Sequence, residues 1–302
     1  MKPLGGVLVA LASPLHRDGS VDEAGVTRLV EHVLAGGVNG LLALGSTGET
    51  ASLDEPARRA MLRAVVKAAA GRVPVLCGVA QPQLSSTIAE IDAARSLGAD
   101  AALVAPPFYY PTDQAGIVDF YRGVAERAAL PVLLYHIPQF TKVHTEPSTV
   151  AALAREGAID GIKDSSRDFE NFEGVCIATR DVADFQVFTG SDTMLVASLA
   201  AGGSGTICGA GNVAPAWVVQ VYDDFQRGDG AAARGSQERL YGLTVSLREG
   251  VFPLAIKAAL HAQGICEAWS APPARELSEP AQRALRKRLE ELGLLTPETS
   301  RH

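Results

Sequence analysis

Cysteine is scarce in this sequence, and the few cysteines lie far apart. The 302 residues contain four cysteines and no C-x-x-C pair: Cys77, Cys176, Cys208 and Cys266. This spacing argues against a disulfide framework and against a structural zinc site, which usually combines closely spaced cysteine or histidine pairs. We expect four reduced thiols that pack as small apolar side chains in a cytoplasmic protein.

Excess positive charge and long apolar runs are also missing. The formal net charge is −7, from 27 Lys and Arg against 34 Asp and Glu, so the basic surface of a nucleic-acid-binding protein is not expected. No run reaches the roughly 18 consecutive apolar residues of a membrane span. The apolar stretch near the N-terminus is soon interrupted by Pro14, His16 and Asp18, so we interpret it as a first strand and not as a signal peptide.

One theme occurs eight times along the chain. A short aliphatic run ends in Gly, Ser, Thr or Pro, and an amphipathic stretch follows, for example over 55–71 or 84–100. Most of the runs are apolar throughout, as expected for strands that are buried on both faces. The predicted strands are 6–14, 40–47, 73–80, 100–107, 131–138, 160–166, 185–192 and 205–212.

The alternation of strands and helices predicts a parallel α/β sheet. Eight units favour closure into a (β/α)8 TIM barrel, with an open, doubly wound sheet as the alternative. We assign residues 1–228 to the barrel and 229–302 to a C-terminal helical extension packed on it or on a neighbouring subunit. The last helices are expected at 215–227, 230–248, 252–263 and 278–293.

Polar and aromatic residues gather where the predicted strands end. In a barrel of this type the active site lies at those ends, so we expect the side chains to converge on one face. The groups are 45–49, 108–110, 135–136, 163–166, 190–192 and 209–212.

Lysine is rare, with six residues among the 27 Lys and Arg. Lys163 alone lies within an apolar predicted strand. We interpret Lys257 as a helix residue whose stem snorkels to the surface, and Lys142 as a loop residue.

A lysine in the barrel mouth is costly unless it is paired or functional. An ion pair of Lys163 with Asp164, Asp192 or Glu49 is the simple alternative to catalysis. Asp164 is adjacent in the strand, however, so its side chain should point to the opposite face.

The chemistry that suits a desolvated lysine is attack of its neutral amine on a carbonyl. Tyr135 and Tyr109 are candidates for proton transfer, although aromatic residues at a barrel mouth often serve packing alone. Ser46 and Thr47 lie in a glycine-flanked turn that we place at a helix start, where hydroxyls and amides suit a carboxylate; a plain turn or helix cap is the alternative.

These motifs, in this order, resemble the dihydrodipicolinate synthase / N-acetylneuraminate lyase family, and the resemblance covers nearly the whole chain. The motifs that carry it are GSTGE at 45–49, the Tyr109 segment, YHIP at 135–138, GIKDSS at 161–166, GSD at 190–192 and GGSGTICGAGN at 202–212.

The resemblance implies a pyruvate-dependent class I aldolase or lyase that needs no metal or organic cofactor. Lys163 matches the lysine that forms the Schiff base, and Tyr135 the tyrosine that assists proton transfer at the imine. Ser46 and Thr47 match the pair that binds the pyruvyl carboxylate, with Thr47 also in a hydroxyl relay.

The resemblance also implies a homotetramer. Tyr109 matches a tyrosine that reaches into a neighbouring subunit's site in the synthases. Gly190 and Ile207 match residues that line the substrate pocket.

The sequence departs from the motifs of both the synthases and the sialic-acid lyases. Phe140 stands where the synthases carry the arginine that holds the carboxylate of the aldehyde, and Lys142 is the nearest cation. His136 replaces the usual Asn, and Ser191–Thr193 lacks the full Asp-Glu pair of the sialic-acid lyases. We therefore expect an aldolase or hydro-lyase on a 2-keto acid whose distal part is not the carboxylate of aspartate semialdehyde.

Three alternatives stay open at this point. One is a dihydrodipicolinate synthase with a relocated carboxylate clamp, and another is a keto-acid-binding regulatory barrel without turnover. The third, a metal-dependent aldolase, would need clustered His and carboxylate ligands, and only His136 is so placed.

Overall fold

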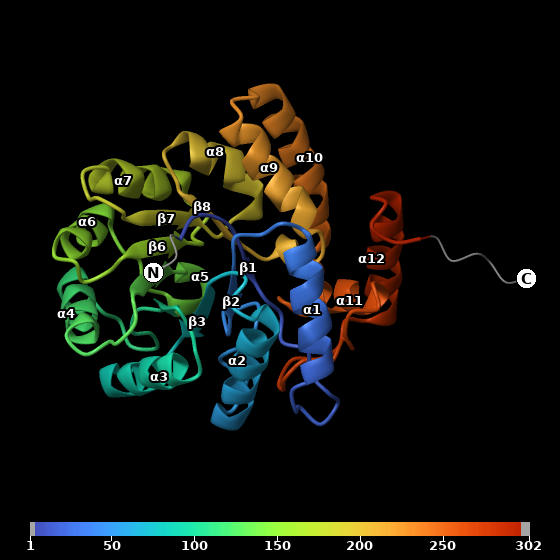
Figure 1. Cartoon of the computed structure of the whole chain (residues 1–302), viewed down its shortest axis with the longest axis horizontal. Coiled ribbons are helices and arrows are strands. Elements are labelled where there is room, and N and C mark those ends of the chain that lie inside the picture. Colours follow the sequence, from blue (N-terminus) through green and yellow to red (C-terminus); the bar gives the residue numbers. More distant parts are fainter. Residues whose placement is uncertain (1–3, 297–302) are drawn as a thin grey trace, which may run out of the picture.

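Eight parallel strands follow one another around a closed barrel, and β8 pairs with β1. The computed structural model describes residues 4–296, so Lys2 and residues 297–302 lie outside the described part. Figure 1 shows the strands at the centre and helices around them. The strands are β1 Gly6–Ala10, β2 Gly40–Ala43, β3 Val75–Val79, β4 Ala101–Val104, β5 Val132–His136, β6 Gly161–Asp164, β7 Gln186–Thr189 and β8 Gly205–Cys208.

The predicted (β/α)8 barrel is therefore confirmed, and each predicted strand contains an observed one. The predictions extend past the C-terminal strand ends because the residues there are used for loops and turns. At the end of β2, for example, the apolar run continues into Leu44, whose φ of 59° takes the chain out of the sheet.

A helix or helical turn follows each strand, and helices after the eighth unit complete the fold. They are α1 Glu23–Ala35, α2 Glu55–Ala69, α3 Leu84–Ser96, α4 Gln114–Ala125, α5 Pro138–Thr141, α6 Pro147–Arg155, α7 Phe169–Thr179, α8 Leu195–Ala200, α9 Pro215–Gln226, α10 Gly230–Ser246, α11 Leu254–Ala262 and α12 Glu279–Glu291, with 3-10 turns Asp192–Met194 and Ala210–Asn212. Aspartate side chains such as Asp54 and Asp168 accept a backbone N–H at helix starts, which fixes where these helices begin.

Alternation along the strands divides the core into two layers. Side chains that point into the barrel include Leu8, Leu42, Leu103 and Phe188, whereas the larger layer lies between barrel and helices. Lys163 is paired in register with Tyr135 on β5 and Phe188 on β7. All three therefore point inward, as the period of two requires.

The C-terminal helices pack against the barrel's last unit. Helix α10 packs on α9, and α12 packs on α11 and α10; in Figure 1 α12 lies at the outer edge, beyond α11. All predicted helices of this part are confirmed to within a few residues. The division between residues 228 and 229 stays a prediction.

The cysteines are free and buried, as predicted. Burial raises the pKa of the Cys77 thiol to about 12, so this thiol stays protonated at neutral pH. Separately, none of the helices within residues 4–296 has the length and hydropathy needed to cross a bilayer.

Candidate active site

Lys163 lies near the C-terminal end of β6 with its amine inside the barrel mouth. Its side chain is 4% exposed, and Nζ donates to the Tyr135 hydroxyl at 3.3 Å and lies 4.5 Å from the centroid of that ring. The Tyr135 oxygen is in turn 3.3 Å from Ser46 Oγ. The three residues come from β5, β6 and the turn after β2, and the fold brings them into one chain of polar atoms.

Gly190 leaves the room that Lys163 occupies. A Cβ added at Gly190 would lie 2.0 Å from Ser165 Oγ and 2.9 Å from Lys163 Cε. Both distances are far below ordinary van der Waals contact. The glycine after β7 therefore permits the extended path of the lysine toward Tyr135.

A cavity of about 470 Å³ opens above Lys163, within the size range of small-molecule sites. Of the predicted site residues, all but one line it: Ser46, Thr47, Tyr135, Phe140, Lys163, Gly190 and Ile207. Ser165 and Asp192, from the predicted strand-end groups, also line it. Arg167, Arg248 and Phe252 line it too, and the sequence had not indicated them.

Tyr109 is the predicted residue that does not line this cavity. It is 85% exposed, forms an edge-to-face pair with Tyr110 at 5.1 Å, and has a φ of 83°. A backbone with positive φ is strained for a tyrosine. Tyr109 thus lies outside the cavity above Lys163 of its own chain.

The turn with Ser46 and Thr47 differs from the prediction in one respect. It is closed by the Gly48 and Glu49 amides, which donate to Gly45 and Ser46 carbonyls, and helix α2 begins only at Glu55. The prediction that Ser46 and Thr47 stand at a helix start was wrong, because Asp54 caps α2. The turn therefore offers hydroxyls to an anion without a helix end behind them.

Lys257 is not a snorkelling residue, and that interpretation was wrong. Its side chain is fully buried, and Nζ donates to Glu49 Oε1 at 2.7 Å. Glu49 Oε2 accepts the Ala271 N–H at 2.8 Å. Burial lowers the pKa of Lys257, and the charge of Glu49 opposes that shift. Because Glu49 is occupied in this way, it does not neutralise Lys163.

Asp192 brings a buried carboxyl group to the cavity. Oδ2 accepts the Ala210 N–H at 3.3 Å, whereas Oδ1 has no hydrogen-bond partner among the described residues. Burial raises the pKa of Asp192, and Lys163 acts in the opposite direction. None of the carboxylates within residues 4–296 forms an ion pair with Lys163, so the simple alternative of a salt-bridged lysine does not apply.

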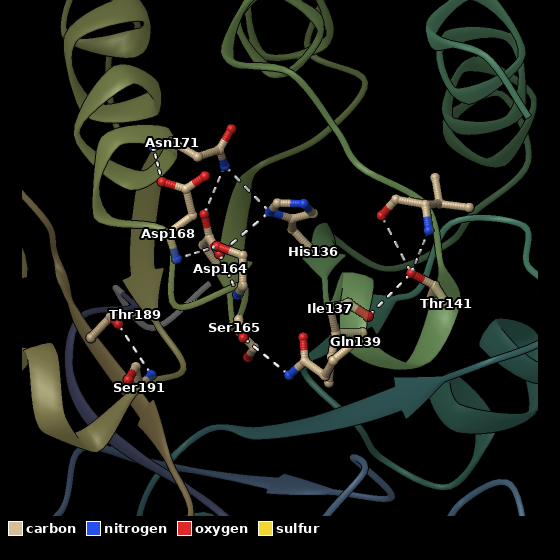
Figure 2. Close-up of polar contacts among 12 residues, drawn as sticks. His136, Ile137, Gln139, Thr141, Asp164, Ser165, Asp168, Asn171, Thr189 and Ser191 are labelled. Atoms are coloured by element: carbon tan, nitrogen blue, oxygen red, sulfur yellow. Dashed lines mark hydrogen bonds and ion pairs between the residues drawn. The ribbon is translucent and has the colours of Figure 1, made fainter.

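A polar network lies on the outer face of β5 and β6, opposite the inward-pointing Tyr135 and Lys163. Figure 2 shows His136 and Asn171 directed at Asp164; His136 Nδ1 is 3.3 Å from Oδ1, and Asn171 Nδ2 donates to Oδ2 at 2.9 Å. Burial alone would raise the pKa of Asp164, but the contacts with His136 and the Ser166 amide leave it lowered. The expected outward direction of Asp164 is confirmed.

The expectation that His136 joins the groups at the barrel mouth was wrong, because its side chain belongs to this outer network and does not line the cavity. Across residues 4–296 no cluster of three His, Cys, Asp or Glu has the arrangement of a metal site. Lys142 does not line the cavity either: its amine donates to the Gln139 carbonyl at 2.9 Å.

The family model described as "Dihydrodipicolinate synthetase family" matches residues 3–292. A DapA-like lyase of Halobacterium salinarum is 35% identical over 97% of this chain and 96% of its own length. A 4-hydroxy-tetrahydrodipicolinate synthase of Pseudomonas aeruginosa is 34% identical over 97% of this chain and 99% of its own.

A solved structure is similar to this chain in fold as well as in sequence. YagE, a prophage protein of the dihydrodipicolinic acid synthase family from E. coli K12, was solved in complex with pyruvate. It superposes with a TM-score of 0.92 at 30% identity, covering 96% of this chain and 99% of YagE. With the match of the family model to nearly every residue, this likeness shows that the chain belongs to the dihydrodipicolinate synthetase family and is a lyase.

Proposed function

We propose that Lys163 forms a Schiff base with the carbonyl of a 2-keto acid, with pyruvate as donor or product. The observation that carries the proposal is a buried amine without a carboxylate partner, placed at 3.3 Å from a tyrosine hydroxyl inside a cavity. An amine that a carbonyl compound can reach acts as the nucleophile of a Schiff base, and the cavity gives a keto acid access to this one. The pyruvate bound to YagE supports the same donor here.

Tyr135 and the turn at 45–49 supply proton transfer and carboxylate binding. The Tyr135 hydroxyl, between Lys163 and Ser46, is placed to pass protons as the carbinolamine loses water. The hydroxyls of Ser46 and Thr47 face the cavity and bind the pyruvyl carboxylate. The iminium on Lys163 then withdraws electrons, so C3 of the pyruvyl group loses a proton and becomes a nucleophilic enamine.

The proposal also covers the cofactor requirement, the location and the assembly of the protein. The imine supplies the electron sink, so we propose that the reaction uses no metal and no organic cofactor. We further propose a cytoplasmic homotetramer in which Tyr109, exposed in the single chain, contacts a neighbouring copy near its site.

For the second substrate, Phe140 argues against the carboxylate of aspartate semialdehyde, because an aromatic ring cannot bind a carboxylate through paired hydrogen bonds. The alternative of a synthase with a relocated clamp has one observation in its favour: Arg167 and Arg248 also line the cavity. Turnover of pyruvate with L-aspartate-β-semialdehyde decides between them, and efficient synthesis supports the clamp.

Exchange of the pyruvate methyl protons in D₂O tests the donor half-reaction without any knowledge of the acceptor. Enamine formation at Lys163 exchanges these protons, so the methyl signal in the proton NMR spectrum should decay with the wild-type protein. Lys163→Met should abolish the decay, whereas Lys67→Met, on exposed helix surface, should leave it unchanged. Equal decay with wild type and Lys163→Met would refute the proposal.

A further inference from the structure

Two arginines line the cavity above Lys163, and the donor half-reaction gives neither of them a role. Arg167 lies between β6 and α7, and Arg248 follows the end of α10 by two residues. Both side chains are exposed, so they stand at the rim of the cavity, whereas the buried Lys163 amine is at its floor. Within residues 4–296 neither guanidinium has a hydrogen-bond or ion-pair partner. Both are therefore open to a ligand that enters the cavity.

The backbone at Arg167 favours glycine, yet the position holds an arginine. Its φ is 66°, in the left-handed region that costs energy for a residue with a Cβ. Hydrogen bonds on both sides hold this turn: Asp164 Oδ1 accepts the Ser166 N–H at 2.7 Å, and Ser166 Oγ accepts the Asp168 N–H at 3.0 Å. Figure 2 shows Asp164 and Asp168 close together in the turn. Strained residues concentrate at functional sites, so the arginine indicates a task for its side chain.

The cavity carries an excess of positive charge, although the whole chain has a formal net charge of −7. Its described lining contains three basic residues, Lys163, Arg167 and Arg248, against one acidic residue, Asp192. Burial raises the pKa of Asp192, which makes its negative charge less available to offset the cations. In the proposed reaction the pyruvyl carboxylate binds at the turn 45–49. The two guanidiniums at the rim are then left without an anion.

We propose that the acceptor is an aldehyde with a terminal anionic group, a carboxylate or a phosphate, and that Arg167 and Arg248 bind this group. The inference rests on the proposed Schiff-base function and names the acceptor class for the same site. A guanidinium presents its N–H donors in a planar fork that matches both anions. Because the aldehyde carbon reacts at Lys163, a short chain must separate it from the anion at the rim. The inference holds whether or not that chain carries the amino group of aspartate semialdehyde.

The reaction is an aldol addition. The Lys163 amine and pyruvate form an imine and release water, and C3 loses a proton to give the enamine. C3 then bonds to the aldehyde carbon, whose oxygen takes up a proton. Water hydrolyses the imine and frees a 4-hydroxy-2-keto acid and the amine, so pyruvate and aldehyde combine without any oxidant, and cleavage is the reverse. The terminal anion takes no part in these steps and only positions the aldehyde.

Two matched pairs of aldehydes test the charge at the far end of the acceptor. Succinic semialdehyde differs from butanal by a terminal carboxylate, and glyceraldehyde 3-phosphate differs from glyceraldehyde by a terminal phosphate. With pyruvate as donor, we expect kcat/KM to be about 100-fold higher for one anionic member than for its neutral partner, since each charge-assisted contact contributes about tenfold. The pair with the larger ratio identifies the anion. Added salt should reduce the ratio, because both arginines are exposed.

Arg167→Gly removes the guanidinium and relieves the left-handed backbone in one change. It should lower kcat/KM about tenfold for the anionic acceptor and leave the neutral one unchanged. Its thermal unfolding midpoint should equal or exceed that of wild type, because glycine adopts a positive φ readily. Arg248→Ala should lower the anionic value by a similar factor, and the double variant should bring the two members of the pair to the same kcat/KM.

Two variants outside the cavity provide matched controls. Asp184 has a φ of 60° in the turn before β7 and does not line the cavity, so Asp184→Gly gives the same backbone relief without the loss of a cavity cation. Arg127 is exposed after α4, away from the cavity lining, so Arg127→Ala removes a surface cation of the same kind. Both should leave the ratio within each aldehyde pair unchanged.

Three outcomes would overturn the inference. One is an equal kcat/KM for the two members of both pairs in the wild-type protein. Another is a ratio that persists in the double variant. The third is a markedly lower unfolding midpoint in Arg167→Gly, which would assign the arginine to the fold. Proton exchange of pyruvate without aldehyde separates these outcomes from failure of the Schiff base, since exchange persists if only the acceptor class is wrong.

Discussion

Two buried lysines in one barrel have opposite surroundings. Lys257 is fully buried and held by Glu49 at 2.7 Å, whereas Lys163 is 4% exposed and donates to the Tyr135 hydroxyl at 3.3 Å. A buried cation is tolerated when a carboxylate compensates its charge. No carboxylate within residues 4–296 forms an ion pair with Lys163, which opens to a cavity. Lys257 therefore holds the fold, whereas Lys163 is free to react.

The largest expected effect follows from removing the reactive member. Lys163→Met should lower turnover on the order of 10⁴-fold or more, as for other lost nucleophiles. Its thermal unfolding midpoint should be unchanged or higher, because a methionine in this place needs no hydration. Steady-state kinetics and calorimetry on the same preparation check both parts, and a strongly destabilised Lys163→Met would contradict the comparison.

Lys257→Met should have the converse effect. It leaves Glu49 buried without its cation, which costs about 3–5 kcal/mol of folding free energy. Urea denaturation measures the loss. Adding Glu49→Gln to Lys257→Met should recover much of it, since the amide oxygen still accepts the Ala271 N–H. An unaltered midpoint in Lys257→Met would show that the ion pair does not hold the C-terminal helices to the turn at 45–49.

Tyr135→Phe removes only the hydroxyl that Lys163 contacts. The ring remains, so packing is retained, but the proton relay between Lys163 and Ser46 is lost. Catalytic proton transfer contributes at least about 100-fold to rates of this kind, so imine formation should slow by that factor. Stopped-flow measurement of imine formation checks it, and a rate within twofold of wild type would exclude Tyr135 from proton transfer.

Asp192→Asn should have the smallest effect, and it depends on pH. Burial raises the pKa of Asp192, so the folded protein binds this proton more tightly than the unfolded chain. The stability that the protonated form provides is present below the unfolded pKa and is lost as pH rises toward the folded pKa. The variant should therefore gain stability relative to wild type as pH rises, by about 1 kcal/mol. Urea midpoints at a series of pH values measure this, and a constant difference would contradict it.

The barrel and Lys163 could be predicted from sequence because both are local signals. Continuous apolar runs indicated the strands, and Lys163 was the one lysine of the six in the sequence that lay inside such a run. Period-two alternation also predicted correctly that Asp164 points away from Lys163.

What escaped prediction depends on long-range contacts. Glu49 is 208 residues before Lys257 in the chain, so no local sequence pattern could predict their ion pair. Phe252 likewise reaches the cavity only because the C-terminal helices return to the barrel mouth. His136 was misplaced although alternation predicts its face: it adjoins the inward-pointing Tyr135 and is paired with Asp164, so its side chain takes the outer face.

Borohydride reduction in the presence of pyruvate tests the central distinction most directly. Peptide mass mapping then compares the peptides that contain Lys163 and Lys257 in one digest. We expect the mass of one reduced pyruvyl group on the Lys163 peptide and none on the Lys257 peptide. An unmodified Lys163 peptide, or modification at Lys257 instead, would contradict it.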